Sequence, residues 1–254
     1  MNTMLYILAF LIIGGSLGFL GGGGSILMVP LLVYGLHMEP KEAIATSMIV
    51  VGIVSAIGAL RYYSSGRLEW KKGLAFGLSG MTGAYMGGQL SFYIPAILLL
   101  TLLSLMMIST GAVLLRHKAK THPHPKKIQK HNSRLRTLIY GLGTGSLTGL
   151  LGAGGGFIIV PALVLLEDME ITSAIPVSLM IIALNCMAGI FGYLQHMNLN
   201  LYLTGRILLA TLVGCIIGCV LSHHLHPESL RKIFAVSILL TAAFQVFRLA
   251  TPFF

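Results

Sequence analysis

Two glycine-rich stretches lie in strongly apolar surroundings and offer backbone groups that suit an anion. The sequence "GFLGGGGSILMVP" covers residues 18–30, and "GLLGAGGGFIIVP" covers residues 149–161. Each stretch predicts an apolar helix, a glycine break and a short helix that starts near Ser25 or Gly156. The first amides of such a helix have no intrahelical acceptor, and the helix dipole favours negative charge beside them. Because glycine also lets a ligand approach the backbone closely, the two breaks predict a binding site for a small anion.

The candidate site consists of backbone amides and neutral side chains. A carrier of metal cations would place carboxylates within the membrane, whereas all seven acidic residues lie in predicted loops or at helix ends. For each hydroxyl or amide side chain taken singly, an ordinary hydrogen bond between helices is an equal alternative to ligand contact. The candidate substrate-binding residues are Gly21, Gly22, Gly23, Gly24, Ser25, Thr46, Ser47, Gly152, Gly154, Gly155, Gly156, Ser178 and Asn185.

Two prolines follow the breaks at matching places. Pro30 and Pro161 lie within the predicted short helices. A proline inside a helix kinks it and frees the carbonyl four residues upstream. Both are therefore candidate gating positions, with simple helix termination as the alternative.

The composition is that of a membrane protein. Of the 254 residues, 56% are hydrophobic and 9% are charged, whereas a soluble domain carries about 25% charged residues. Several apolar blocks approach the roughly 20 residues that a helix needs to cross a bilayer. These blocks cover residues 43–60, 73–90, 94–115, 174–194, 204–222 and 229–250. The sequence predicts an all-α polytopic membrane protein, and it contains no nucleotide-binding or other cofactor motif.

An internal repeat divides the chain into two halves. A gapless shift of 131 residues superposes Pro30 on Pro161, Gly21 on Gly152, Ser47 on Ser178 and Tyr62 on Tyr193. We therefore expect a first transmembrane repeat over residues 1–115, a basic linker over 116–136 and a second transmembrane repeat over 137–254. Each repeat is expected to hold five helical segments, at about 4–20, 25–36, 43–61, 73–90 and 94–115 in the first and 131 residues later in the second.

The distribution of basic residues predicts opposite orientations for the two repeats. Lys and Arg gather on the cytoplasmic side of short loops. Eight of the 17 lie in the linker and four lie between residues 61 and 72, whereas the corresponding loop of the second half, "QHMNLNLYL", contains none. The linker is then cytoplasmic and both termini lie outside. Inverted repeats with broken helices near the membrane midplane are typical of secondary transporters.

The sequence contains the paired motifs "GFLGGGGSILMVPLLV" and "GLLGAGGGFIIVPALV", each of which is followed by a helix with a serine, Ser47 or Ser178. In these motifs it resembles the TauE/SafE sulfite exporter family, also called the 4-toluene sulfonate uptake permeases. The resemblance covers essentially the whole chain. It implies a multi-pass carrier in a bacterial or archaeal inner membrane, for small sulfur-containing anions such as sulfite, sulfoacetate or other sulfonates. Ala153 departs from the motif by interrupting the second glycine run.

The leading functional hypothesis is a secondary transporter that moves such an anion by alternating access. The expected partners are the anion and the lipid bilayer but no nucleic acid; a coupling ion and a homodimer are left open. A divalent metal-ion transporter is the alternative, using histidines on the cytoplasmic side: His117, His122, His124, His131, His223, His224 and His226. An enzyme is not expected, because the intramembrane Ser and Cys have no histidine or carboxylate at matching depth. Glycine pairs such as Gly14 and Gly18 are expected to serve helix packing.

Overall fold

The structure is a computed structural model, and it describes residues 3–64, 70–116, 133–152, 154–166, 169, 171–194, 200–221, 236 and 238–247. All regular secondary structure within these residues is helical, which confirms the predicted all-α class. The helices of the first half are α1 (Thr3–Leu20), α3 (Pro40–Ser64), α4 (Trp70–Ser91) and α5 (Ala96–Arg116), with the short elements η1 (Gly23–Leu27), α2 (Met28–Pro30) and η2 (Leu31–Gly35) between α1 and α3. Those of the second half are α6 (Ser133–Leu151), α7 (Gly156–Leu166), α8 (Ile171–Leu194) and α9 (Leu201–Leu221), followed by an apolar helix over Ile238–Phe247.

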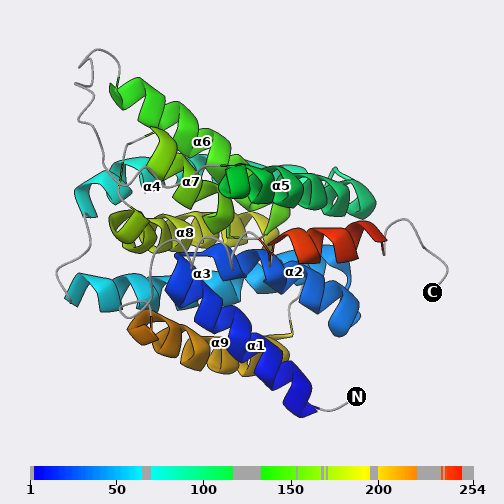
Figure 1. Cartoon of the computed structure of the whole chain (residues 1–254). Helices are drawn as coiled ribbons and strands as arrows, with labels where there is room; N and C mark the ends of the chain where they lie inside the picture. The colour runs from blue at the N-terminus through cyan, green and yellow to red at the C-terminus, as the bar shows by residue number, and fades with distance from the viewer. Residues whose placement is uncertain are drawn as a thin grey trace.

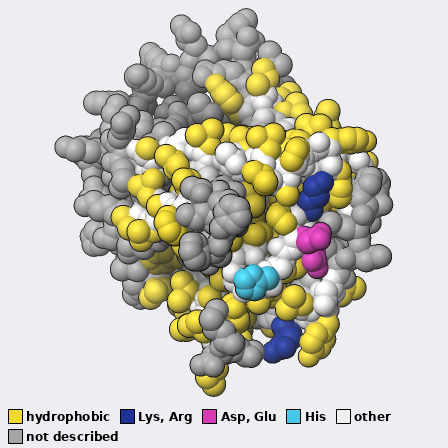
Figure 2. All heavy atoms as spheres, turned by 90° about the vertical axis from the view of Figure 1, so that its right-hand side faces the viewer, with side chains coloured by type: hydrophobic (Ala, Val, Ile, Leu, Met, Phe, Trp, Pro, Cys, Tyr) yellow, Lys and Arg dark blue, Asp and Glu magenta, His cyan; other side chains and the backbone are white. Residues whose placement is uncertain are grey.

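Three of the described helices are long and apolar enough to cross a membrane, namely Pro40–Tyr63, Ser173–Tyr193 and Leu201–Leu221. The first two of these spans are mostly buried inside the molecule. The outer surface is rich in large apolar side chains such as Met86, Phe191 and Leu209. Figure 2 shows one face of the molecule, on whose described part hydrophobic side chains are widespread and charged side chains are few. Such a surface is favourable in a bilayer and unfavourable in water.

The helices pack so that each half contributes to both sides of the molecule. Figure 1 shows α3 and α8 in the middle, with α4 and α6 on one side and α1 and α9 on the other. Helix α1 of the first half therefore packs along α9 of the second, and α6 of the second half packs along α4 of the first. The N-terminal helix of each half lies against the other half.

Glycine allows these helix pairs to approach closely. A Cβ atom at Gly14 would lie 2.7 Å from the carbonyl carbon of Thr211 on α9, and one at Gly145 would lie 2.7 Å from that of Gly80 on α4. Any side chain at either position would push two backbones apart. The expectation that these glycines serve helix packing is confirmed at both interfaces.

The short segment after the first break is less regular than predicted. Instead of one helix over 25–36, the chain forms a 3₁₀ turn, a single α-turn and a π-turn in succession. Pro30 lies where the α-turn gives way to the π-turn, and it has no N–H to donate into the helix. In the second half the corresponding helix α7 is continuous, with Pro161 inside it.

Several sequence predictions fall outside the described residues. Residues 117–132 of the predicted linker (116–136) and the histidines of the metal hypothesis belong to this group. The two ends of that linker are described and helical, since α5 ends at Arg116 and α6 begins at Ser133. Within the part of the chain that the structure describes, no group of three or more His, Cys, Asp or Glu side chains is placed to hold a metal ion.

Candidate anion site at two glycine breaks

The two glycine breaks have backbone conformations that favour glycine. Gly21 and Gly22 have φ angles of 65° and 97°, and Gly152, Gly154 and Gly155 have φ angles of 63°, 65° and 66°. An L-residue with a Cβ atom pays a steric penalty of roughly 1–2 kcal/mol in this left-handed region. The glycine runs thus end α1 and α6 by turning the chain sharply before the short helical segments begin.

The two breaks, which lie 131 residues apart in sequence, touch each other in the fold. A Cβ atom at Gly156 would lie 2.5 Å from the Cα atom of Gly22, and one at Gly22 would lie 2.8 Å from the Cα atom of Gly156. A Cβ atom at Gly154 would lie 3.2 Å from the Ser25 hydroxyl oxygen. The fold therefore brings Gly22, Ser25, Gly154 and Gly156 together, and these four predicted site residues form the contact between the breaks.

Ser47 and Ser178 hold the breaks from the opposite half. The Ser178 hydroxyl donates to the Gly21 carbonyl at 2.6 Å, and the Ser47 hydroxyl donates to the Gly152 carbonyl. Each hydroxyl also lies within hydrogen-bond distance of a carbonyl one turn earlier in its own helix, that of Ile175 at 2.8 Å or Ile44 at 2.7 Å. Because each hydroxyl has one proton, it is shared between these acceptors. In this conformation both serines support the backbone of the breaks.

Gly24 and Gly155 turn toward their own preceding helices. A Cβ atom at Gly24 would overlap the Ser16 hydroxyl of α1, and one at Gly155 would overlap the Thr148 hydroxyl of α6. These two glycines allow the short segments to fold back against α1 and α6. They line the packed side of each break, away from the contact between the breaks.

The start of α7 presents backbone amides at the second break. The Gly155 carbonyl accepts hydrogen bonds from the amides of Ile158 and Ile159, both at 2.9 Å. The amides of Gly156 and Phe157 precede that of Ile158 in the first turn of α7. At these positions a helix offers no carbonyl of its own to accept from the N–H groups. At the first break the Gly22 carbonyl accepts from both the amide and the hydroxyl of Ser25, at 3.2 and 2.6 Å.

Thr46 and Asn185 carry buried polar atoms that have no hydrogen-bond partner within the described residues. The Asn185 side chain is fully buried and lies against Gly80 of α4, where a Cβ atom would be 3.0 Å from its amide nitrogen. A buried amide with neither atom paired costs several kcal/mol in an apolar medium. Asn185 thus lies at the α4–α8 interface, two turns along α8 from Ser178.

Two tyrosines support the helices that lead into the breaks, a role that the sequence reasoning did not assign. The Tyr62 hydroxyl donates to the Gly18 carbonyl and the Tyr193 hydroxyl donates to the Gly149 carbonyl, both at 3.2 Å. The repeat alignment paired Tyr62 with Tyr193, and this pairing was the available signal. Both rings are buried.

We expect Tyr62→Phe and Tyr193→Phe to lower stability by similar amounts, about 1 kcal/mol each, because each removes one hydrogen bond to a carbonyl of a helix that leads into a break. The measurement is thermal unfolding of the purified protein in detergent. Tyr140→Phe, on the partly buried Tyr140 of α6, serves as the comparison. Equal unfolding temperatures for all three variants and the parent protein would contradict this role.

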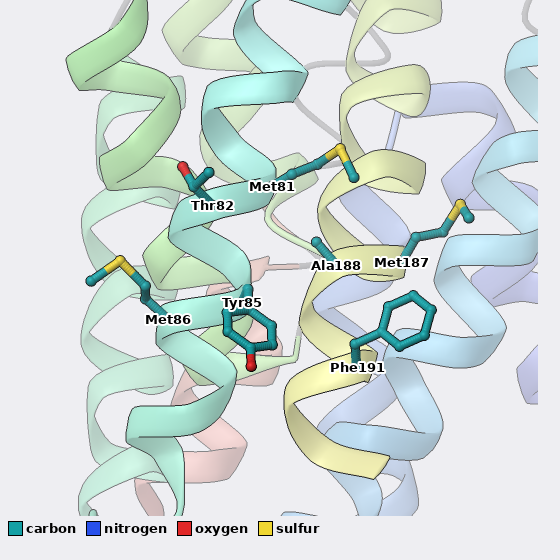
Figure 3. A pocket seen from close by; sticks show the side chains of 7 residues that line it. All are labelled: Met81, Thr82, Tyr85, Met86, Met187, Ala188 and Phe191. Atoms are coloured by element: carbon teal, nitrogen blue, oxygen red, sulfur yellow. The ribbon is translucent and has the colours of Figure 1, made fainter. Parts of the chain in front are cut away.

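A separate groove between α4 and α8 has a volume of about 520 Å³ and a different character (Figure 3). Met81, Tyr85, Met86, Met187 and Phe191 contribute to its lining. Met86 and Phe191 are well exposed at 64% and 61%, so the groove opens to the surroundings of the molecule. The Thr82 hydroxyl in its wall donates to the Ser79 carbonyl at 2.8 Å. This apolar groove does not suit an anion.

All thirteen residues of the predicted site are buried. The contact between the breaks is closed to solvent in this conformation. A ligand could reach it only after the surrounding helices separate.

The described residues form a helical membrane protein in which two glycine breaks meet. The sequence profile of the family described as "Sulfite exporter TauE/SafE" matches residues 6–244. The chain therefore belongs to the TauE/SafE family, as its motifs predicted.

Several relatives of this chain are named as probable membrane transporter proteins. A "Probable membrane transporter protein" of Xylella fastidiosa strain Temecula1 is 30% identical over 244 residues, which is 93% of this chain and 92% of the relative. The "Probable membrane transporter protein YdhB" of Bacillus subtilis is 27% identical over 85% of this chain and 88% of its own length. The "Probable membrane transporter protein MJ0441" of Methanocaldococcus jannaschii is 31% identical over 75% of this chain and 72% of its own length. No solved structure matches the chain significantly.

Proposed function

We propose that this protein is a secondary transporter that moves a small sulfur-containing anion, such as sulfite or a sulfonate, across the inner membrane of a bacterial or archaeal cell. The observation that carries the proposal is the contact between the two glycine breaks, at which Gly22 lies against Gly156. Backbone amides at helix starts bind oxyanions without a charged side chain. The described acidic residues, Glu39 and Glu42, lie before and in the first turn of α3, so the membrane-embedded region described here offers no carboxylate that would repel the anion.

The family supports the choice of substrate class. The matching profile is described as that of a sulfite exporter, and a sulfite or sulfonate group presents several oxygens that can accept from backbone N–H groups. The amides of Gly156 and Phe157, at the start of α7, are the donors we assign. The Ser25 hydroxyl lies at the same contact, where it donates to the Gly22 carbonyl.

We further infer that the two halves, residues 1–115 and 137–254, are inverted repeats joined by a cytoplasmic linker. Reciprocal contacts support this: Ser178 bonds to Gly21, and their repeat mates Ser47 and Gly152 bond in the same way. The pairs α1–α9 and α6–α4 are reciprocal as well. A two-fold axis that exchanges the two halves would turn each of these contacts into the other one. The uneven distribution of Lys and Arg along the sequence supports an axis that lies in the membrane plane.

Alternating access follows from this arrangement. The closed contact between the breaks corresponds to an occluded conformation, and rocking of one repeat against the other would open it to either side. The energy would come from an ion gradient, the membrane potential or the anion gradient, since the sequence carries no nucleotide-binding motif. Pro30 and Pro161 interrupt the hydrogen bonding of the short segments that would have to move.

The metal-ion alternative gains no support. Its histidines lie outside the described residues, and the names of the matching family and relatives mention no metal. Replacing these histidines by glutamine is expected to leave anion flux unchanged.

The test is flux into proteoliposomes that contain the purified protein. Radiolabelled sulfite, sulfoacetate and an aryl sulfonate are compared with sulfate, chloride and a divalent metal ion at matched ionic strength. We expect saturable flux of at least one sulfite or sulfonate that exceeds the flux through protein-free vesicles. Metal flux without any flux of sulfite, sulfoacetate or the aryl sulfonate would refute the proposal.

A further inference from the structure

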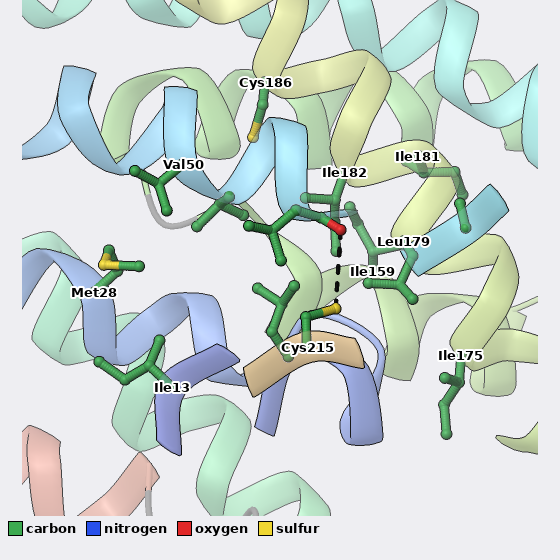
Figure 4. Close-up of a cluster of buried hydrophobic side chains, with 14 of the residues drawn as sticks. Ile13, Met28, Val50, Ile159, Ile175, Leu179, Ile181, Ile182, Cys186 and Cys215 are labelled. Atoms are coloured by element: carbon green, nitrogen blue, oxygen red, sulfur yellow. Dashed lines mark hydrogen bonds between the residues drawn. The ribbon is translucent and has the colours of Figure 1, made fainter. Parts of the chain in front are cut away.

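Ile182 of α8 contacts both glycine breaks at once. Its side chain is fully buried. Its Cδ1 atom occupies the position that a Cβ atom at Gly22 would need, and its Cγ2 atom lies 3.2 Å from the position of a Cβ atom at Gly154. Figure 4 shows Ile182 on α8, among the packed side chains of the buried cluster. One apolar side chain therefore lies against the first break on one side and the second break on the other.

Val51 of α3 is the repeat mate of Ile182 and has a related position. It is also fully buried, and its Cγ1 atom lies 2.6 Å from the position of a Cβ atom at Gly154. Valine lacks the terminal methyl group that isoleucine carries. The two halves thus place a branched apolar side chain at the same contact, but the chain from α8 reaches further.

Ile182 lies directly against Gly22 and Gly154, and Val51 lies directly against Gly154. The Ser25 hydroxyl oxygen is the polar side-chain atom nearest to Gly154, so Ile182 and Val51 supply the apolar part of the surroundings of the breaks. When the amides of Gly156 and Phe157 hold the oxygens of a sulfonate, its organic substituent must lie against other side chains near the breaks. Sulfite has no further group, whereas a sulfonate has an organic substituent that needs apolar room.

We propose that Ile182 and Val51 form the size-selecting wall of the site and limit the organic substituent of a bound sulfonate. This inference rests on the proposed function. The wall favours sulfite and sulfonates with a short substituent over those with a bulky one, because the two branched side chains fill the apolar space. One methylene group in an apolar pocket changes discrimination by about 10- to 200-fold.

The test measures relative affinity for methanesulfonate and 4-toluenesulfonate, from ligand-dependent thermal stabilisation of the purified protein, with sulfite as reference. Ile182→Val removes the methyl group beside Gly22 and is expected to shift the affinity ratio at least tenfold toward 4-toluenesulfonate. Val51→Ile adds a methyl group beside Gly154 and is expected to shift the ratio the opposite way. The comparison is Ile181→Val, which removes the same methyl group from the neighbouring residue. Ile181 is also fully buried, but it is not among the nearest neighbours of any glycine in the two breaks.

The outcomes separate the two claims. If the parent protein binds sulfite or sulfonates but neither Ile182→Val nor Val51→Ile changes the ratio, the wall is refuted and the proposed function stands. An equal change in Ile181→Val would also refute the wall, because the effect would then be general to the core. If the parent protein binds none of the three anions, the proposed function fails and this inference fails with it. Opposite shifts in the two wall variants, with none in Ile181→Val, support the wall.

Discussion

Gly156→Ala is expected to abolish anion flux in proteoliposomes while leaving a helical, membrane-inserted protein. The added Cβ atom would lie 2.5 Å from the Cα atom of Gly22 and 2.6 Å from its carbonyl carbon. Both neighbours are backbone atoms, so no side-chain rotation relieves the overlap, and the two breaks must separate. Overpacking of this kind typically costs about 1–3 kcal/mol, which the circular dichroism spectrum and the unfolding temperature will report.

The chain offers matched controls for this substitution. Gly143 of α6 and Gly205 of α9 have open space where a Cβ atom would be added, and alanine favours helix over glycine. Gly143→Ala and Gly205→Ala are therefore expected to retain flux and unfolding temperature. Parental flux in Gly156→Ala would show that the contact between the breaks is not needed for transport.

Ser47→Ala and Ser178→Ala are expected to destabilise the protein by similar amounts, about 1–3 kcal/mol each. Each substitution leaves a buried break carbonyl, that of Gly152 or Gly21, without the hydroxyl from the opposite half, and an unsatisfied buried acceptor carries this cost. Thermal unfolding of the single and double variants measures the effect. We also expect slower anion flux in both, because the breaks lose the contact that fixes their position.

Ser104→Ala is the control for the two serine variants. Ser104 is also buried, and within the described residues its hydroxyl donates to the Leu100 carbonyl of its own helix, at 3.0 Å. That carbonyl belongs to the regular helical ladder, so a smaller loss of stability is expected. If both break variants unfold at the same temperature as Ser104→Ala, the hydrogen bonds between the halves do not stabilise the breaks.

The sequence predicted the helical class and the positions of several helices well, because hydrophobic blocks of membrane length are strong local signals. The predicted segments 43–61 and 73–90 lie within α3 and α4, and the predicted start of the second short helix at Gly156 is the start of α7. The family was identified from the two paired motifs. The packing role of Gly14 also follows from local reasoning, since glycine in an apolar helix indicates close helix contact.

The contacts within the site could not be predicted, because they depend on how distant segments meet. The sequence paired Ser47 with Ser178 as repeat mates, but their bonds to Gly152 and Gly21 appear only in the folded chain. The position of Ile182 between both breaks likewise has no local signal, since one more isoleucine in an apolar helix is unremarkable in sequence. The predicted regular helix after the first break was wrong in detail: the chain passes from a 3₁₀ turn to an α-turn and a π-turn around Pro30, which has no N–H to continue a regular helix.

The most direct test of the anion site is the unfolding temperature of the purified protein in detergent, with and without each anion. A ligand that binds only the folded state adds about 2.7 kcal/mol of stability at one hundred times its dissociation constant. We predict that sulfite or a sulfonate raises the unfolding temperature, that chloride and divalent cations do not, and that Gly156→Ala loses the effect while Gly143→Ala keeps it. Stabilisation by a divalent metal alone, or an undiminished anion effect in Gly156→Ala, would contradict an anion site between the two glycine breaks.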